Sequence, residues 1–141
     1  MRFSQKAEYA VRAAVDLAQH CRVGQPARVA DIAKRAHIPE KFLEAILLDL
    51  RKAGLVNSWR GPEGGHALAS APGEITLGKI RSAIDGPLTL VEPGRKKTAV
   101  DAGLGDVWKE VALALATVLD GVTVEDMCRR VHEHQPTDYS I

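Results

Sequence analysis

The fold of this chain is decided by residues 51–68, which read RKAGLVNSWRGPEGGHAL. Gly54 follows two basic residues, which is the pattern of a helix C-terminus: glycine adopts the left-handed conformation there, and cations complement the helix dipole. The helical spacing of apolar residues then ends: residues 55–59 favour a β-strand, and residues 66–69 favour one more weakly. The turn-rich stretch 60–65 separates the two runs. The segment therefore predicts a helix followed directly by a β-hairpin.

Three helices are expected before this hairpin. Ser4 is a suitable N-cap for the first, which extends to about His20. After a break rich in glycine and proline, a short second helix is expected at residues 29–36. A turn at residues 36–39 leads into the third helix, because proline fits the first turn of a helix and nothing deeper.

The third helix has one apolar and one polar face. Its apolar residues recur at the spacing of a single buried stripe: Phe42, Leu43, Ile46, Leu47 and Leu50. The residues expected to face outward are Glu40, Lys41, Glu44, Ala45, Leu48 and Arg51. Two helices joined by a tight turn and followed by a hairpin are typical of a winged helix-turn-helix. We therefore predict a mainly α fold with a small β-hairpin wing.

The chain divides into three parts. Residues 1–87 are predicted to form the winged helix-turn-helix domain. Residues 88–104 show no periodicity and are predicted to be a loop and a candidate effector or regulatory segment, since loops of this length are usually functional or disordered. Residues 105–141 are predicted to hold a long dimerisation helix and a C-terminal helix.

Four signals set the ends of these later helices. Thr76 is expected to be the N-cap of the last helix of the winged domain, and Asp106 is expected to be the N-cap of the long helix. Gly121 is expected to end the long helix. Thr123 and Asp126 have the spacing of a capping box, which predicts the start of the C-terminal helix.

Length and composition exclude several classes of protein. A chain of 141 residues with 45% apolar and 26% charged residues is of ordinary globular composition. Its two cysteines, Cys21 and Cys128, cannot form a disulfide scaffold or a cysteine-only zinc site. The first residues are too charged for a signal peptide, and the longest apolar run, residues 111–118, is too short for a membrane span. We therefore expect a soluble, cytoplasmic protein without a membrane partner.

No motif points to catalysis. Neither a nucleophile–His–carboxylate spacing nor a carboxylate pair stands out, and the glycines of residues 60–65 precede a strand rather than a helix, unlike a phosphate-binding loop. His132 and His134 lie two residues apart, on different sides of a helix, and so do not predict a metal site. We predict that the chain is not an enzyme and has no catalytic residues, no metal site and no cofactor.

The charge is divided unevenly along the chain. Residues 1–87 carry 13 Lys and Arg against 9 Asp and Glu, whereas residues 88–141 carry 6 against 9. A basic front suits contact with phosphates, although an ordinary distribution of surface charge explains four extra cations equally well.

Several motifs together resemble the Rrf2 family of bacterial winged-helix transcriptional regulators. They are Met1-Arg2-Phe3-Ser4, Tyr9-Ala10-Val11, Asp31-Ile32-Ala33, Phe42-Leu43-Glu44, Arg51-Lys52-Ala53-Gly54-Leu55-Val56 and Arg60-Gly61-Pro62-Glu63-Gly64-Gly65. The resemblance is strong over residues 1–90 and extends to the rest of the chain in layout. It implies a homodimer whose long C-terminal helices cross and carry two wings to the half-sites of a palindromic operator in double-stranded DNA. Repression is the expected mode of action.

The fold and the resemblance together give a set of candidate DNA-binding residues: Arg2, Ser4, Pro39, Glu40, Lys41, Glu44, Arg51, Arg60, Gly61 and Pro62. Glu44 could accept a hydrogen bond from a cytosine amino group, or simply pair with Lys41 on the helix surface. Lys41 and Arg51 suit phosphates. Arg60, on a slim hairpin tip, suits a narrow minor groove, the alternative being an ordinary exposed turn arginine.

Two further sets of residues are candidates for association and for sensing. Trp108, Val111, Leu115 and Val118 form a stripe that predicts a dimer interface, the alternative being intramolecular core. Cys21 and Cys128 are a candidate thiol sensor, because basic neighbours can lower a thiol pKa; isolated cysteines are otherwise inert.

The chain departs from its cluster-binding relatives in two places, the wing residues Glu63 and His66 and, more seriously, the cysteines. Those relatives carry three cysteines in the loop that corresponds to residues 88–104, where this chain has none. We therefore predict a colourless, cluster-independent regulator that responds to a small-molecule or protein effector or to thiol oxidation. A winged helix that binds another protein instead of DNA is the alternative function.

Overall fold

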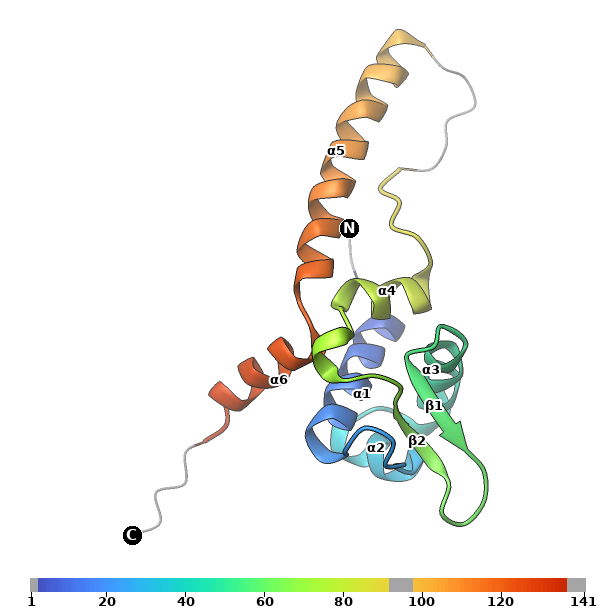
Figure 1. Ribbon diagram of the computed structural model, residues 1–141. Helices are drawn as coiled ribbons and strands as arrows, with labels where there is room; N and C mark the ends of the chain where they lie inside the picture. The colour runs from blue at the N-terminus through green and yellow to red at the C-terminus, as the bar shows by residue number, and fades with distance from the viewer. Residues whose placement is uncertain (1–2, 92–97, 137–141) are drawn as a thin grey trace.

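The described part of the chain, residues 3–91 and 98–136 of a computed structural model, folds into helices and one β-hairpin (Figure 1). In chain order the elements are α1 (Gln5–His20), α2 (Val29–Ala36), α3 (Glu40–Lys52), β1 (Val56–Trp59), β2 (Gly65–Leu68), a 3-10 turn η1 (Pro72–Glu74), α4 (Leu77–Asp85), α5 (Ala99–Gly121) and α6 (Val124–Glu133). This is the mainly α fold with a small β wing that the sequence predicted.

Three predicted N-caps are confirmed. Ser4 and Thr76 each accept a hydrogen bond from the amide three residues on, at 3.0 and 3.1 Å. Thr123 and Asp126 form the predicted capping box. Each cap satisfies an amide that helix geometry leaves without an intrahelical partner, so these polar residues fix where α1, α4 and α6 begin.

The long helix begins earlier than predicted. α5 starts at Ala99, behind a Thr-x-x-Asp capping box at residues 98–101, and Asp106 lies inside the helix rather than at its N-cap. The end of the predicted loop 88–104 therefore forms the first turns of α5. The prediction was wrong because two glycines in these turns, each costing a helix about 1 kcal/mol relative to alanine, masked the capping signal.

α1 is the central helix of the winged domain. Its buried side carries Ala7, Ala10, Ala13 and Ala14, and these small side chains let α2, α3, α4 and α6 pack around it. Large apolar side chains fill the spaces between the helices: Leu17, Ile32, Leu43, Ile46, Leu47, Leu50, Val56, Ile75, Ile80 and Val124. Burying one such side chain contributes about 1.5–3 kcal/mol. The domain thus has its own core, on which α3 and the hairpin are held.

α5 leaves this core and projects away from it (Figure 1). Its C-terminal end is held by two backbone hydrogen bonds of 2.8 Å, from the Leu77 amide to the Val122 carbonyl and from the Val124 amide to the Ile75 carbonyl. No residue of α5, which the structure describes in full, is buried. Within residues 3–91 and 98–136, no helix combines the length and apolarity that crossing a membrane requires.

Candidate nucleic-acid interface

A tight turn joins α2 to α3. His37 ends α2 in the left-handed conformation with φ 55°. The Ile38 amide donates to the Ala33 carbonyl at 3.0 Å, and the Ile38 side chain is buried. Pro39 is the N-cap residue of α3, and its carbonyl accepts the first amide hydrogen bonds of that helix. The turn therefore fixes the angle between the two helices of a helix-turn-helix.

α3 presents a charged face to solvent. The exposed residues on this face match the prediction: Glu40, Lys41, Glu44, Ala45, Leu48 and Arg51. Lys6 of α1 pairs with Asp49 at 2.7 Å, which ties α3 to the domain core. Lys41 and Arg51 can therefore reach phosphates from a fixed helix, and the Glu44 carboxylate between them can accept a hydrogen bond from a base.

Phe42 lies on the surface, although we predicted it as part of the buried stripe. Its exposed fraction is 51%, and the Lys41 ammonium lies 5.7 Å from the centre of its ring. One residue turns a helix by about 100°, so Phe42 lies beside the stripe that contains Leu43 and Ile46 rather than within it. The surface of α3 thus includes an aromatic side chain that periodicity assigned to the core.

The hairpin loop is held at two points. The Gly64 amide donates to the Gly61 carbonyl at 3.0 Å, which closes the turn. Arg28, which precedes α2, donates through Nη2 to the Pro62 carbonyl. No sequence signal predicts this second contact, because 34 residues separate its partners. Arg28 is therefore a positioning residue for the wing that sequence reasoning missed.

An isolated β-bridge braces the base of the wing. Ala27 pairs with His66 through two backbone hydrogen bonds of 2.8 Å. Gly65 lies beside this bridge with φ 151°, and a Cβ there would approach the Ala27 carbonyl oxygen to 2.5 Å. Only glycine fits at this position, so the sequence Gly64-Gly65 is a packing requirement of the wing.

Arg60 lies at the start of the hairpin loop, which projects from the body beside α3 (Figure 1). It is exposed, and within the described residues its guanidinium makes no hydrogen bond or ion pair. An unpaired guanidinium on a braced loop is available to a DNA groove.

His66 connects the wing electrostatically to α3. Its Nδ1 lies 2.7 Å from the Ser58 hydroxyl, its cross-strand neighbour. Burial, and secondarily the positive charge of Arg51, lowers the pKa of the His66 imidazole. The hairpin therefore favours a neutral His66.

The structure brings most of the predicted DNA-binding residues to the helix-turn-helix and the wing, with two exceptions. Ser4 lies at the start of α1, where its hydroxyl caps that helix and bonds both carboxylate oxygens of Asp85 at 2.8 Å. Arg2 lies outside the described residues. Pro39 and the Pro62 carbonyl hold the turn and the wing in shape, whereas Lys41, Glu44, Arg51 and Arg60 project side chains.

The stripe predicted as a dimer interface is exposed in the single chain. Trp108 and Val111 are 43% and 40% exposed and Val118 is 65% exposed, while Leu115 is half-buried. With Leu104, these residues are spaced alternately by four and three, which is the repeat of a coiled-coil seam. The intramolecular-core alternative does not account for such exposure.

The two thiols have raised pKa values, opposite to the expected effect of their basic neighbours. Burial raises the pKa of Cys21 and outweighs the lowering by Arg35. Burial, with a smaller effect of Glu125, raises the pKa of Cys128. Both thiols are therefore largely protonated at neutral pH, which slows reaction with oxidants. Their role as a sensor stays a prediction.

The donor set does not fit an iron–sulfur cluster. Such clusters usually need four thiolates close together, and the whole chain has two cysteines. Over residues 3–91 and 98–136, His, Cys, Asp and Glu side chains form no group of three or more that could hold a metal ion.

Comparison with known proteins gives one consistent result. The model of the Rrf2 family, described as an iron-dependent transcriptional regulator, matches residues 3–130. The HTH-type transcriptional regulator IscR of Aliivibrio salmonicida is 32% identical over 100% of this chain and 88% of its own length. The corresponding values for the HTH-type transcriptional regulator CymR of Bacillus subtilis are 34%, 90% and 89%.

Solved structures agree with the sequence comparisons. The structure of CymR, the global cysteine regulator of B. subtilis, superposes with a TM-score of 0.77 at 32% identity, covering 92% of this chain and 98% of that one. IscR of T. potens superposes with a TM-score of 0.75 at 34% identity, covering 99% and 95%.

Proposed function

Since the chain belongs to the Rrf2 family of transcriptional regulators, we propose that this DNA-binding regulator acts as a homodimer on a palindromic operator and represses transcription in the bacterial cytoplasm. α3 enters the major groove of each half-site, where Glu44 contacts a base and Lys41 and Arg51 contact phosphates. Arg60 enters the adjacent minor groove.

The exposed seam on α5 carries the homodimer part of this proposal. Leu104, Trp108, Val111, Leu115 and Val118 form an apolar stripe on a helix that leaves the domain core. A soluble chain gains stability by covering such a stripe, and a second α5 with the same spacing is complementary to it. Two winged domains joined in this way would meet DNA about one helical turn, or a multiple of one, apart.

The proposal includes no iron–sulfur cluster, because the two cysteines do not supply the required thiolates. The signal is instead a small molecule, a protein, or oxidation of the thiols. The segment before α5 supports an effector role, because it connects the winged domain to the dimerisation helix.

Selection of bound fragments from genomic DNA, followed by fluorescence anisotropy on the best fragment, tests the proposal. With about 6–10 phosphate contacts, affinity should fall about 10³–10⁵-fold between roughly 50 and 200 mM salt. A selected fragment should also contain an inverted repeat. No enrichment of any fragment, or affinity that hardly changes with salt, would contradict DNA binding by this surface.

One observation favours the alternative function, a winged helix that binds protein. Phe42 and Leu48 are 51% and 42% exposed on or beside the outward face of α3, and apolar side chains suit a protein partner. Phe42→Ala separates the two functions: DNA affinity should change little compared with Arg60→Ala, whereas a protein partner that uses α3 should lose its main apolar contact.

A further inference from the structure

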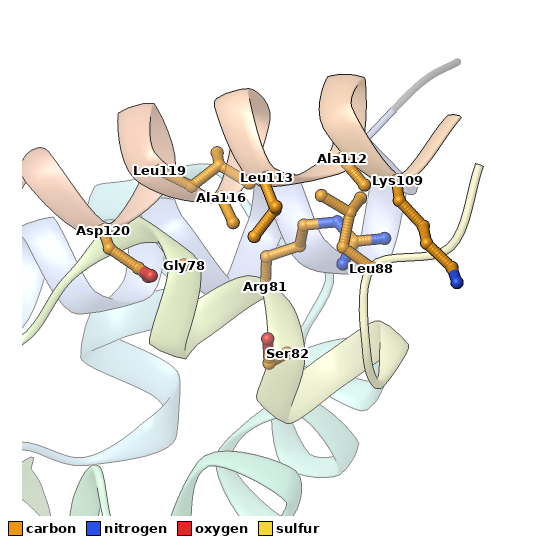
Figure 2. Close-up of a pocket in the computed structure, with 10 residues that line it drawn as sticks. All are labelled: Gly78, Arg81, Ser82, Leu88, Lys109, Ala112, Leu113, Ala116, Leu119 and Asp120. Carbon is orange, nitrogen blue, oxygen red and sulfur yellow. The ribbon is translucent and has the colours of Figure 1, made fainter. Parts of the chain in front are cut away.

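A cavity of about 530 Å³ lies between α4 and α5, outside the nucleic-acid interface (Figure 2). Its apolar walls come mainly from α5, through Ala112, Leu113 and Ala116, and from Leu88, which follows α4. The volume falls within the range of about 300–1,000 Å³ that is typical of small-molecule sites.

The cavity has the shape of a wedge that narrows at Gly78. A Cβ at this position would collide with the Asp120 carboxylate and would lie 3.5 Å from the Leu119 backbone, so the C-terminal end of α5 lies in close contact with α4. From this crossing α5 rises away from α4 toward its N-terminal end (Figure 1). Lys109 lies 11 residues before Asp120 on the same helix, which corresponds to about 16 Å. The cavity is therefore elongated.

The charges lining the wedge are arranged by sign. Figure 2 shows the Arg81 guanidinium, Leu88 and Lys109 toward one end of the row of lining residues and Asp120 at the other. Arg81 donates through Nη1 to the Gly86 carbonyl at 3.3 Å, which leaves its other donors available. In the part of the chain that the structure describes, the Lys109 ammonium has no hydrogen-bond or ion-pair partner.

α5 has two apolar faces that point in different directions. At 100° per residue, the face that lines the wedge, centred on Ala112 and Ala116, lies more than a quarter turn from the seam that contains Val111 and Val118. A second chain can therefore cover the seam while the wedge stays open to a small ligand.

We propose that the wedge between α4 and α5 is an effector site for an elongated organic monoanion: one carboxylate between Arg81 and Lys109, and an apolar acyl or aryl body against Ala112, Leu113 and Ala116. Asp120 at the narrow end repels a second acid group, which excludes dicarboxylates. The regulatory consequence rests on the proposed function: a ligand that prefers one angle between α4 and α5 changes the placement of the two winged domains, and so changes operator affinity.

Calorimetric titration of the full chain without DNA tests the site directly. The probes are decanoate and naphthylacetate, each paired with an uncharged analogue, decanol and naphthylacetamide. We expect saturable binding of at least one acid, one per chain, at least tenfold tighter than its analogue. Absence of saturable binding by both acids, or equal binding of acid and analogue, overturns the proposal.

Variants locate the binding. Arg81→Gln and Lys109→Gln should each weaken binding of the acid about tenfold, while Arg130→Gln, on the exposed surface of α6, should not. Leu113→Glu places a carboxylate one turn from Lys109 and should also weaken binding; because Leu113 is 69% exposed, this variant should still fold, as circular dichroism would verify. Unchanged binding in all three cavity variants overturns the assignment.

Two further measurements separate this inference from others. Sedimentation with saturating acid should show an unchanged association state; dissociation of the dimer by the acid would mean that the wedge belongs to the interface between copies, and would overturn the proposal. Operator affinity should change at least threefold with the acid, and not in Lys109→Gln. Acid binding without any DNA binding would refute the proposed function alone, and acid binding with unchanged DNA affinity would refute the regulatory step alone.

Discussion

At the scale of single residues, the interface separates side chains that hold shape from side chains that are free to bind. Arg28 is committed to the Pro62 carbonyl, and Gly65 to close packing on Ala27. Arg60 and Glu44 make no hydrogen bond or ion pair among the described residues. Substitutions of the first kind should change stability, and substitutions of the second kind should change DNA binding.

Arg60→Ala should weaken operator binding by about 1–3 kcal/mol, because the side chain is exposed, unpaired and carried on a braced loop. The melting temperature should not change. Anisotropy on the selected fragment measures the loss, and Arg130→Ala, an exposed arginine on α6, is the matched control. Equal losses in the two variants would show that Arg60 contributes only net charge.

The stability of the wing should depend on pH through His66. Its pKa in the folded protein is lowered by burial and by Arg51, so the unfolded state binds a proton first as the pH falls. The stabilisation is complete above the unfolded pKa of about 6.5 and is lost as the pH decreases toward the folded value. Urea unfolding at several pH values between neutral and mildly acidic should show a steeper loss in the wild type than in His66→Gln. Parallel curves would exclude this role.

At the scale of elements, the wing depends on glycines that differ in what surrounds them. Gly65→Ala adds a methyl group against the Ala27 carbonyl oxygen, whereas the same change at Gly61, with φ 99°, meets open space. Both positions carry backbone strain for alanine, about 1–3 kcal/mol, but only Gly65→Ala adds a clash. Hydrogen exchange of the β1–β2 amides should therefore accelerate more in Gly65→Ala than in Gly61→Ala. The reverse order would contradict the bridge at Ala27.

The pairing of α1 with α2 depends on one buried carboxylate. Asp16 is 5% exposed and accepts two hydrogen bonds from Arg35, at 3.0 and 2.9 Å. Asp16→Ala should lower the free energy of unfolding by about 1.5–3 kcal/mol, the range for hydrogen bonds to charged groups. Glu8→Ala, which breaks the exposed pair with Arg12, should cost at most about 1 kcal/mol. Similar effects of the two substitutions on chemical denaturation would show that the buried pair has no special weight.

The elements that could be predicted from sequence are those with local signals. Ser4, Thr76 and Thr123 act through the next helical turn, and Gly54, with φ 78°, ends α3 through its own conformation. The early start of α5 was hidden by local propensity, since glycines weakened a signal that was present. The Ala27–His66 bridge and the Arg28–Pro62 contact join distant residues and could not be predicted from one sequence.

At the scale of the whole molecule, the arrangement of α5 relative to the core leaves one apolar surface of the single chain uncovered. The winged domain buries its own apolar residues, but the α5 seam remains exposed in one chain. Periodicity shows that a helix carries an apolar stripe, but it does not show whether that stripe packs on the same chain or on another one. Trp108 therefore had two interpretations in sequence, and its exposure in the fold favours association.

Association through the seam leads to the last prediction, Val111→Glu. Val111 lies in the centre of the seam, so pairing of two α5 helices would bury a carboxylate without a partner, at a cost of several kcal/mol. The variant should sediment as a monomer at micromolar concentration, while the wild type sediments as a dimer. Its winged domain should melt like that of the wild type, because Val111 contributes nothing to the buried core. Operator affinity should fall steeply, since one winged domain makes half of the phosphate contacts of two. Leu113→Glu places the same charge on the face of α5 toward α4 and should remain dimeric. A wild-type monomer, or monomers from both variants, would show that the seam is not the surface through which two chains associate.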